Sequence, residues 1–158
     1  MTYIERLKII SLAVLLALAP TVTLAAETKA DGENVNQQVT CLTKNAYYEA
    51  RGQSKAGKIA VMHVVMNRTR DSRFPITPCK VVQQRQKGHC QFSWVCTGSS
   101  GIHEKQVYND LQGLARLVYD GEIHDNTNGA KFFHNVNVHP NWRGCKTTTK
   151  IGAHIFCR

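Results

Sequence analysis

Glu49 is the acidic residue whose setting in this sequence could change its chemistry. It lies in the segment Asn45-Ala46-Tyr47-Tyr48-Glu49-Ala50-Arg51-Gly52. Its spacing from Leu42 and Ala46 places all three residues on one face of a helix. A carboxylate on an apolar face loses water, which disfavours its charged form and raises its pKa. Such an acid can donate a proton near neutral pH. The alternative is a solvated helix-end carboxylate that pairs with Arg51.

Aromatic residues later in the chain suggest what Glu49 would act on. Sugars dock on aromatic faces, which Phe92, Trp94 and Trp142 can provide. Trp94 lies in a polar loop, so we expect it to face a cleft; core packing is the alternative for each aromatic. His134 could line the site beside Glu49 or pair with a backbone carbonyl. A buried carboxylic acid beside aromatic residues suits cleavage of a glycosidic bond, whose leaving group needs protonation.

Several other enzyme signatures are absent from the sequence. It has no Gly-x-Ser-x-Gly, no Walker loop, no dinucleotide-binding Gly-x-Gly-x-x-Gly and no His-Glu-x-x-His. It has six cysteines, an even number that indicates disulfides in a small exported domain. The two local pairs, Cys90 with Cys96 and Cys145 with Cys157, are the favoured bridges. Sequence alone does not decide the full pairing, and all six are candidates: Cys41, Cys79, Cys90, Cys96, Cys145 and Cys157. No Cys-x-x-Cys pair is present, which disfavours a zinc site.

The first 26 residues have the pattern of a secretory signal. Arg6 and Lys8 precede an apolar run over 9–19, and small residues follow up to Leu24-Ala25-Ala26. We expect cleavage after Ala25 or Ala26; a retained membrane anchor is the alternative. The whole chain has a formal net charge of +9, which suits a polyanionic target such as an anionic wall polymer, a membrane surface or nucleic acid.

The rest of the chain predicts one α+β domain that is mostly helical with a small β element. Residues 27–38 are polar and predict a flexible lead-in, and the domain proper is expected over 39–158. Helices are predicted over about 40–51, from Ser54 through an apolar run at 59–66, over 79–86, and over about 103–120. An irregular loop is expected at 87–101. Extended segments are predicted at 130–134 and about 147–157, joined by the loop that holds Trp142. His63 is expected to be a hydrogen-bonded core histidine.

Ordered motifs over almost all of the chain after the signal resemble one family. The chain is similar to the SleB/CwlJ type of cell-wall hydrolase, the spore-cortex-lytic enzyme group. The matching pieces are Cys41-Leu42, Ala46-Tyr47-Tyr48-Glu49-Ala50-Arg51-Gly52, Gly57, Val64-Val65-Met66-Asn67-Arg68, Phe74-Pro75, Cys79, Val81-Val82, Cys90-Gln91-Phe92-Ser93-Trp94, Cys96, Gly129-Ala130-Lys131-Phe132-Phe133-His134, Pro140-Asn141-Trp142 and Ile151-Gly152-Ala153-His154-Ile155-Phe156.

The resemblance implies a lysozyme-like fold related to lytic transglycosylases, with a short β-hairpin. It implies cleavage of peptidoglycan glycan strands between N-acetylmuramic acid and N-acetylglucosamine, with Glu49 as the catalytic acid. It implies cleft walls at 91–94 and 132–134. The expected substrate-binding residues are Tyr48, Gln91, Phe92, Ser93, Trp94, His134 and Trp142. The family often has Glu where this chain has Gln53, and Tyr where it has Phe132 and Phe133.

A single acid at a motif position favours a lytic transglycosylase that forms a 1,6-anhydro product. Glu104, Asp120 and Asp125 are expected to be surface residues. Muramidase-type hydrolysis of the same bond is the alternative. A zinc amidase with ligands among His134, His139 and His154, and a non-catalytic wall-binding or nucleic-acid-binding module, explain the motif set less well.

The expected partner is peptidoglycan, with no nucleic acid, no metal and no cofactor. The expected location is the periplasm or the extracellular cell wall, and the membrane is expected to be involved only through the signal segment. We expect a monomer.

Overall fold

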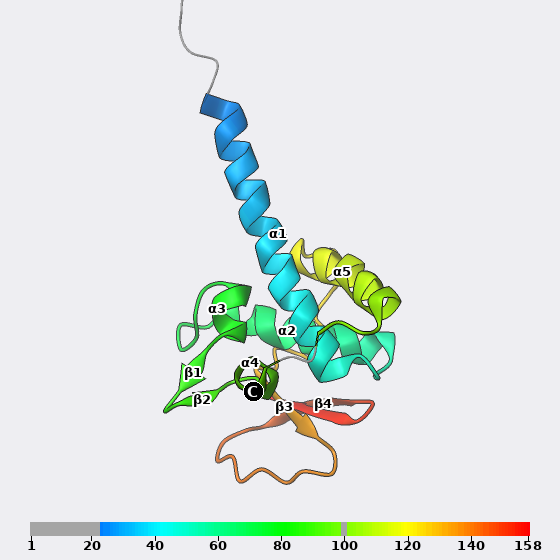
Figure 1. Cartoon of the computed structure of the whole chain (residues 1–158). Coiled ribbons are helices and arrows are strands. Elements are labelled where there is room, and N and C mark those ends of the chain that lie inside the picture. Colours follow the sequence, from blue (N-terminus) through cyan, green and yellow to red (C-terminus); the bar gives the residue numbers. More distant parts are fainter. Residues whose placement is uncertain (1–22, 99–100) are drawn as a thin grey trace, which may run out of the picture. The chain divides into compact units, whose positions relative to one another are not determined.

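The computed structural model describes residues 23–98 and 101–158, with side chains from Asn34 onward. Contacts divide the chain into two units, residues 1–32 and residues 33–158, and the core belongs to the second. The elements in chain order are α1 (Thr23–Ala50), α2 (Lys55–Thr69), α3 (Pro78–Val82), β1 (Arg85–Gln86), β2 (His89–Cys90), α4 (Ser93–Thr97), α5 (Lys105–Tyr119), β3 (Phe132–Asn135), β4 (Thr147–Ile151) and β5 (His154–Cys157), as Figure 1 shows.

Helix α1 corrects the prediction of a flexible lead-in over 27–38, because those residues are helical. Val35 packs against the core and Gln38 is buried, where its side-chain oxygen accepts a hydrogen bond from the Cys79 amide at 3.0 Å. The Cys41–Cys79 disulfide fixes the same contact between α1 and α3. These contacts hold the helix against the core from Val35 onward, although the sequence there is polar. The predicted signal peptide lies mostly outside the described residues.

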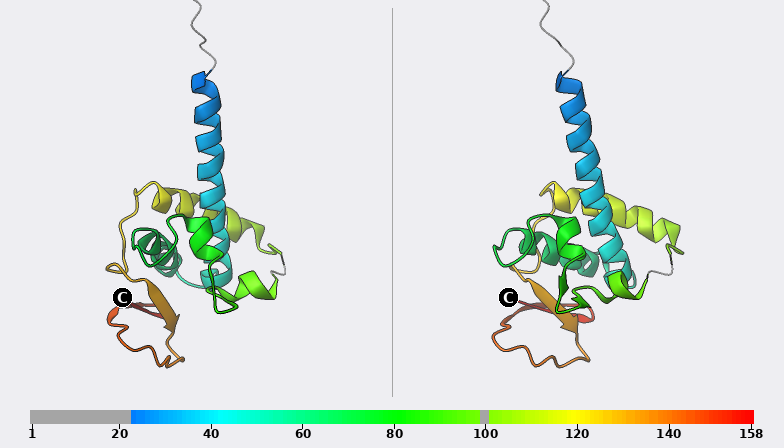
Figure 2. Two further views of the ribbon diagram at one scale, coloured as in Figure 1. Left: turned by 90° about the vertical axis from the view of Figure 1, so that its left-hand side faces the viewer. Right: turned by 60° about the vertical axis from the view of Figure 1, so that its left-hand side comes forward.

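Helix α2 is the central helix of the domain. The Ser54 side chain accepts a hydrogen bond from the Gly57 amide, as predicted for a cap, and every residue from Ile59 to Met66 is buried. The helix contacts α3 and α5 as well as strands β3 and β4. Figure 2 shows the sheet on one side of α2 and α5 on the other. His63 is buried as expected, but neither ring nitrogen has a hydrogen-bond partner among the described residues, and burial lowers its pKa.

The end of α2 anchors the loop that leads into β3. The Asn67 side-chain amide donates to Asp125 at 2.8 Å, to Thr127 at 3.3 Å and to the Ala130 carbonyl at 3.1 Å. Asp125 also accepts from the amides of Thr127 and Gly129. Asp125, which was expected to be a surface residue, is therefore a partly buried structural acceptor.

The segment between α3 and α5 has more regular structure than predicted. The helix expected over 79–86 ends at Val82, and β1 and β2 then form an antiparallel hairpin with Gln86 opposite His89. The hairpin turns at Lys87 and Gly88, which have φ of 50° and 82°. Helix α4 follows, and the predicted Cys90–Cys96 disulfide joins β2 to it. Strands of two residues are too short to leave a pattern in the sequence.

Helix α5 matches its prediction closely and buries Leu111 and Val118 of the expected stripe. The side chain of Glu104, which precedes the helix, does not cap its first turn. Instead the Tyr47 hydroxyl, from α1, accepts hydrogen bonds from the His103 and Glu104 amides at 3.2 Å each.

The sheet has the strand order β3-β5-β4, and both pairs are antiparallel. The predicted extended segments are therefore present, and β4 and β5 form the hairpin that turns at Gly152. The predicted Cys145–Cys157 disulfide ties the loop before β4 to β5. The prediction of an α+β, mostly helical fold is confirmed. None of the helices among the described residues has the length and hydrophobicity needed to cross a membrane.

Gln53 joins the end of α1 to this sheet. Its side-chain oxygen accepts a hydrogen bond from the Ala153 amide at 3.1 Å, in the β4–β5 turn. Gly152 in that turn has φ of 57°, and a Cβ there would lie 2.6 Å from the same oxygen. A glutamate, which the SleB/CwlJ type often has at position 53, would offer an equivalent acceptor.

Candidate active site

Glu49 lies in the last turn of α1 and is half-buried. Burial raises the pKa of its carboxyl above the usual value of 4.5. Among the described residues no cation pairs with it, because Arg51 instead binds Glu104 at 3.0 Å and lies over the Tyr47 ring. The alternative in which Arg51 pairs with Glu49 is thus not what the structure shows. The setting favours the protonated form of Glu49, as an acid catalyst requires.

The Glu49 side chain lines a hollow of about 270 Å³. Its lining comes from α1, α2, the segment from β2 to α4, strand β3 and the loop after β3. Within the described part of the chain, Glu49 is its single acidic residue. The lining residues are Glu49, Arg68, Cys90, Gln91, Phe92, Ser93, Phe132, Phe133 and Trp142.

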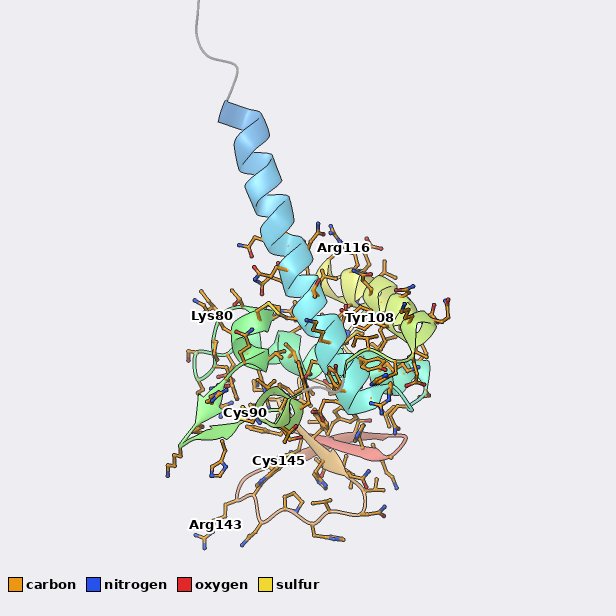
Figure 3. The ribbon with its side chains drawn as sticks, in the orientation of Figure 1. Lys80, Cys90, Tyr108, Arg116, Arg143 and Cys145 are labelled. Atoms are coloured by element: carbon orange, nitrogen blue, oxygen red, sulfur yellow. A yellow bond between two sulfur atoms is a disulfide. The ribbon has the colours of Figure 1, made fainter. Side chains whose placement is uncertain are left out.

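One wall of the hollow is the short segment closed by the Cys90–Cys96 disulfide. The backbone amide of Gln91 donates to the Gln84 carbonyl at 2.9 Å, which ties this segment to the chain before β1. Phe92 is buried, whereas Gln91 and Ser93 are exposed and present polar side chains to the opening. Figure 3 shows Cys90 beside α4, at the base of the β1–β2 hairpin. The disulfide therefore holds the side chains of Gln91 and Ser93 in place although no long helix or strand carries them.

The opposite wall is aromatic and comes from β3 and the loop after it. Phe132 and Phe133 pair with Cys157 and Phe156 of β5. The Phe132 ring lies 6.0 Å from the Trp142 ring between centroids, and Trp142 is 47 % exposed. A large apolar face that stays half open to solvent at a hollow suits stacking against a sugar ring.

Arg68 lines the interior of the hollow and was not among the residues predicted for the site. It is 2 % exposed, and its Nε donates to the Lys131 carbonyl at 2.6 Å. Burial lowers its pKa to about 10, so the guanidinium is still charged at neutral pH. The sequence shows Arg68 as part of a polar helix end, and that pattern gives no sign of burial.

Three of the predicted substrate-binding residues do not line the hollow. Trp94 stacks on Tyr48 with ring centroids 4.6 Å apart and donates from Nε1 to the Asn45 side chain at 3.2 Å. The Tyr48 hydroxyl donates to the Gly101 carbonyl at 3.2 Å. Trp94 therefore braces α1 and does not face this cleft as expected. His134 packs edge-on against Trp142, and its Nδ1 lies 2.9 Å from the Asn135 carbonyl.

Other parts of the described structure offer weaker candidates for chemistry. No group of three or more His, Cys, Asp or Glu side chains among the described residues could hold a metal ion, so His134, His139 and His154 do not form a zinc site there. A larger hollow of about 440 Å³ is lined by residues of α2 and α5, including Lys55 and Lys58. Asp110 is the acidic residue among its described lining, and it is exposed and therefore not desolvated.

Comparisons with known proteins place this chain in a family. The model of the cell wall hydrolase family matches residues 52–157, which begin just after Glu49. The structure resembles the catalytic domain of the germination-specific lytic transglycosylase SleB from Bacillus anthracis, with 25 % identity, a TM-score of 0.62, and coverage of 77 % of this chain and 93 % of that one. It also resembles the catalytic domain of the Bacillus cereus SleB protein, with 26 % identity, a TM-score of 0.58, and coverage of 77 % and 91 %. The comparison with curated proteins found no match. The predicted fold is confirmed, and this chain belongs to the cell wall hydrolase family.

Proposed function

We propose that this protein cleaves peptidoglycan glycan strands between N-acetylmuramic acid and N-acetylglucosamine, as a lytic transglycosylase. The observation that carries the proposal is Glu49, which is the single acidic residue among the described lining of the hollow and has a pKa raised by burial. Family membership supports action on the cell wall, and one similar structure is itself named as a lytic transglycosylase.

The proposed reaction uses Glu49 first as an acid and then as a base. The protonated carboxyl donates its proton to the glycosidic oxygen, and the bond from that oxygen to C1 of the muramoyl residue breaks. The Glu49 carboxylate then removes the proton from the C6 hydroxyl of the same sugar. The C6 oxygen bonds to C1 and closes a 1,6-anhydro ring. The proton returns to Glu49, so one carboxyl group completes the cycle.

The two walls would hold the glycan on either side of Glu49. Trp142 and Phe132 offer an aromatic face for a sugar ring, and Gln91 and Ser93 offer polar groups for its hydroxyls and acetamides. The absence of tyrosine at positions 132 and 133 removes two hydroxyls, so polar recognition would fall to the opposite wall.

Product analysis tests the proposal. Purified peptidoglycan is digested and the fragments are identified by mass spectrometry; we expect anhydromuramoyl ends, which are lighter than reducing ends by one water. Reducing ends without anhydro product would overturn the mechanism in favour of hydrolysis. The Glu49→Gln variant should lose activity while it keeps its fold, and Glu122→Gln, at an exposed position, is the matched control. An active Glu49→Gln variant would remove Glu49 from the mechanism.

We further propose that residues 1–26 direct export and that the protein acts in the periplasm or the extracellular wall as a monomer. The basic start and apolar run of that segment support export. Fractionation of cells that express the full chain should place a shortened protein outside the cytoplasm. A full-length protein that stays in the cytoplasm would contradict this.

A further inference from the structure

Arg68 is a buried cation in the hollow, and none of the ion pairs among the described residues includes it. Its side chain is enclosed by aromatic rings, with the guanidinium carbon 5.2 Å from the centroid of Phe74 and 5.4 Å from those of Phe92 and Phe132. Burying a charge without a partner is costly, so a folded protein rarely keeps one without a use.

Among the described residues, most of the hydrogen-bonding capacity of Arg68 is unused. A guanidinium carries five N–H donors, and the Nε–H meets the Lys131 carbonyl. Nη1 is buried and has no partner among the described residues. The surrounding rings attract the positive charge but cannot accept conventional hydrogen bonds. The side chain therefore lines the hollow with a full charge and with a buried N–H donor group that no described residue satisfies.

Glu49 does not satisfy this charge. No ion pair within the described part of the chain joins the two side chains, and the raised pKa of Glu49 has burial as its cause. A protonated Glu49 is neutral, so it leaves Arg68 able to bind an anion in the same hollow.

We infer that Arg68 is an anion-recognition residue that binds a carboxylate of the substrate. This inference rests on the proposed function, because it places a glycan in the hollow. Guanidinium N–H donors suit a carboxylate, and such charge-assisted hydrogen bonds are strong. The lactyl group of the muramoyl residue at the cleaved bond carries a carboxylate when no stem peptide is attached to it. That group sits on the same sugar ring that Glu49 acts on, so it is nearer than any carboxylate of a stem peptide. Arg68 thus selects glycan strands whose lactyl groups are free.

Binding in a protein that cannot turn over tests this inference. The Glu49→Gln variant is titrated by calorimetry with three forms of a GlcNAc–MurNAc tetrasaccharide. The first has free lactyl carboxylates, the second has them converted to neutral methyl amides, and the third carries stem peptides. We expect the free acid to bind at least tenfold more tightly than the methyl amide. This comparison needs no substitution at Arg68. Equal affinity for the free acid and the methyl amide would overturn the inference. Tightest binding of the peptide-bearing form would overturn the lactyl assignment.

Variants then assign the preference to one residue. In the Glu49→Gln background, Arg68→Met should abolish the preference for the free acid, and Arg68→Lys should keep part of it. Arg70→Met removes the same charge from an exposed position two residues away and should keep the full preference. A preference that survives Arg68→Met would contradict the inference. Circular dichroism and thermal unfolding establish that each variant is folded. If Arg68→Met does not fold, a reduced preference in Arg68→Lys carries the assignment, and an unchanged preference in Arg68→Lys would contradict it.

The two proposals fail in different ways. If the wild-type protein releases anhydro fragments but the free-acid and methyl-amide probes bind equally, only the role of Arg68 is wrong. If peptidoglycan is not cleaved and no probe binds, the proposed function itself is wrong.

Discussion

The disulfides allow stability and activity to be separated in one experiment. The Cys90–Cys96 bridge joins residues 6 apart and encloses the wall residues Gln91 and Ser93. The Cys41–Cys79 bridge joins residues 38 apart, and neither of its cysteines lines the hollow. Because the stabilisation by a disulfide grows with the logarithm of its loop length, removal of the short bridge should cost about 2 kcal/mol and removal of the long one about 4 kcal/mol.

Activity should follow the opposite order. Without Cys90–Cys96 the wall segment loses its closure, and kcat/KM should fall on the order of ten to a hundredfold because the groups facing the sugar are misplaced. Without Cys41–Cys79 the wall is intact, so activity measured well below the melting temperature should change little.

The assay compares two double variants, Cys90→Ser with Cys96→Ser and Cys41→Ser with Cys79→Ser. Urea unfolding at constant temperature gives the free energy of unfolding, and release of soluble fragments from peptidoglycan gives the rate. The reasoning is refuted if the short bridge costs more stability than the long one, or if its loss leaves kcat/KM unchanged.

Three other predictions concern a carboxyl group, a turn and the net charge. Burial raises the pKa of Glu49 above 4.5, so the folded state is destabilised as that carboxyl ionises with rising pH. Urea unfolding should show Glu49→Gln more stable than wild type at pH 7 and equal to it in acid, where both side chains are neutral. A stability difference that does not change with pH would contradict this. Gly152→Ala should lower stability by about 1 to 2 kcal/mol, because φ is 57° and the new Cβ would displace the Gln53 oxygen; a thermal melt that does not move would argue against that contact. The chain has a net charge of +9, so its sedimentation with anionic wall sacs should weaken as added salt shortens the Debye length from about 30 Å to about 3 Å; salt-independent sedimentation would exclude electrostatic attachment.

Local patterns predicted the parts of this fold that local interactions determine. The apolar run from Ile59 to Met66 can only be buried, and it forms the central helix. The spacing of Leu111 and Val118 defines the inner face of α5. Cysteines 6 and 12 residues apart form two of the bridges, since short loops close easily.

The wrong predictions come from contacts between distant residues. Gln38 keeps a polar segment helical through its bond to Cys79, 41 residues away. Trp94 looks free in a polar loop, yet its partners Tyr48 and Asn45 are on α1. Arg68 has the sequence setting of a solvated helix end, but the rings around it come from three separate segments. For the candidate site, the sequence therefore indicated Glu49 and residues of both walls, and it gave no sign that Arg68 is buried beside them.

The hydroxyl of Tyr47 has a consequence for how the molecule assembles. Because this phenol supplies the acceptor for the two amides that immediately precede α5, the approach to α5 is held by a residue more than fifty positions earlier. A chain in which α1 has not yet docked would leave both amides without that acceptor. Docking of the end of α1 therefore helps to fix where α5 begins, and it links a neighbour of Glu49 to the helix on the far side of α2.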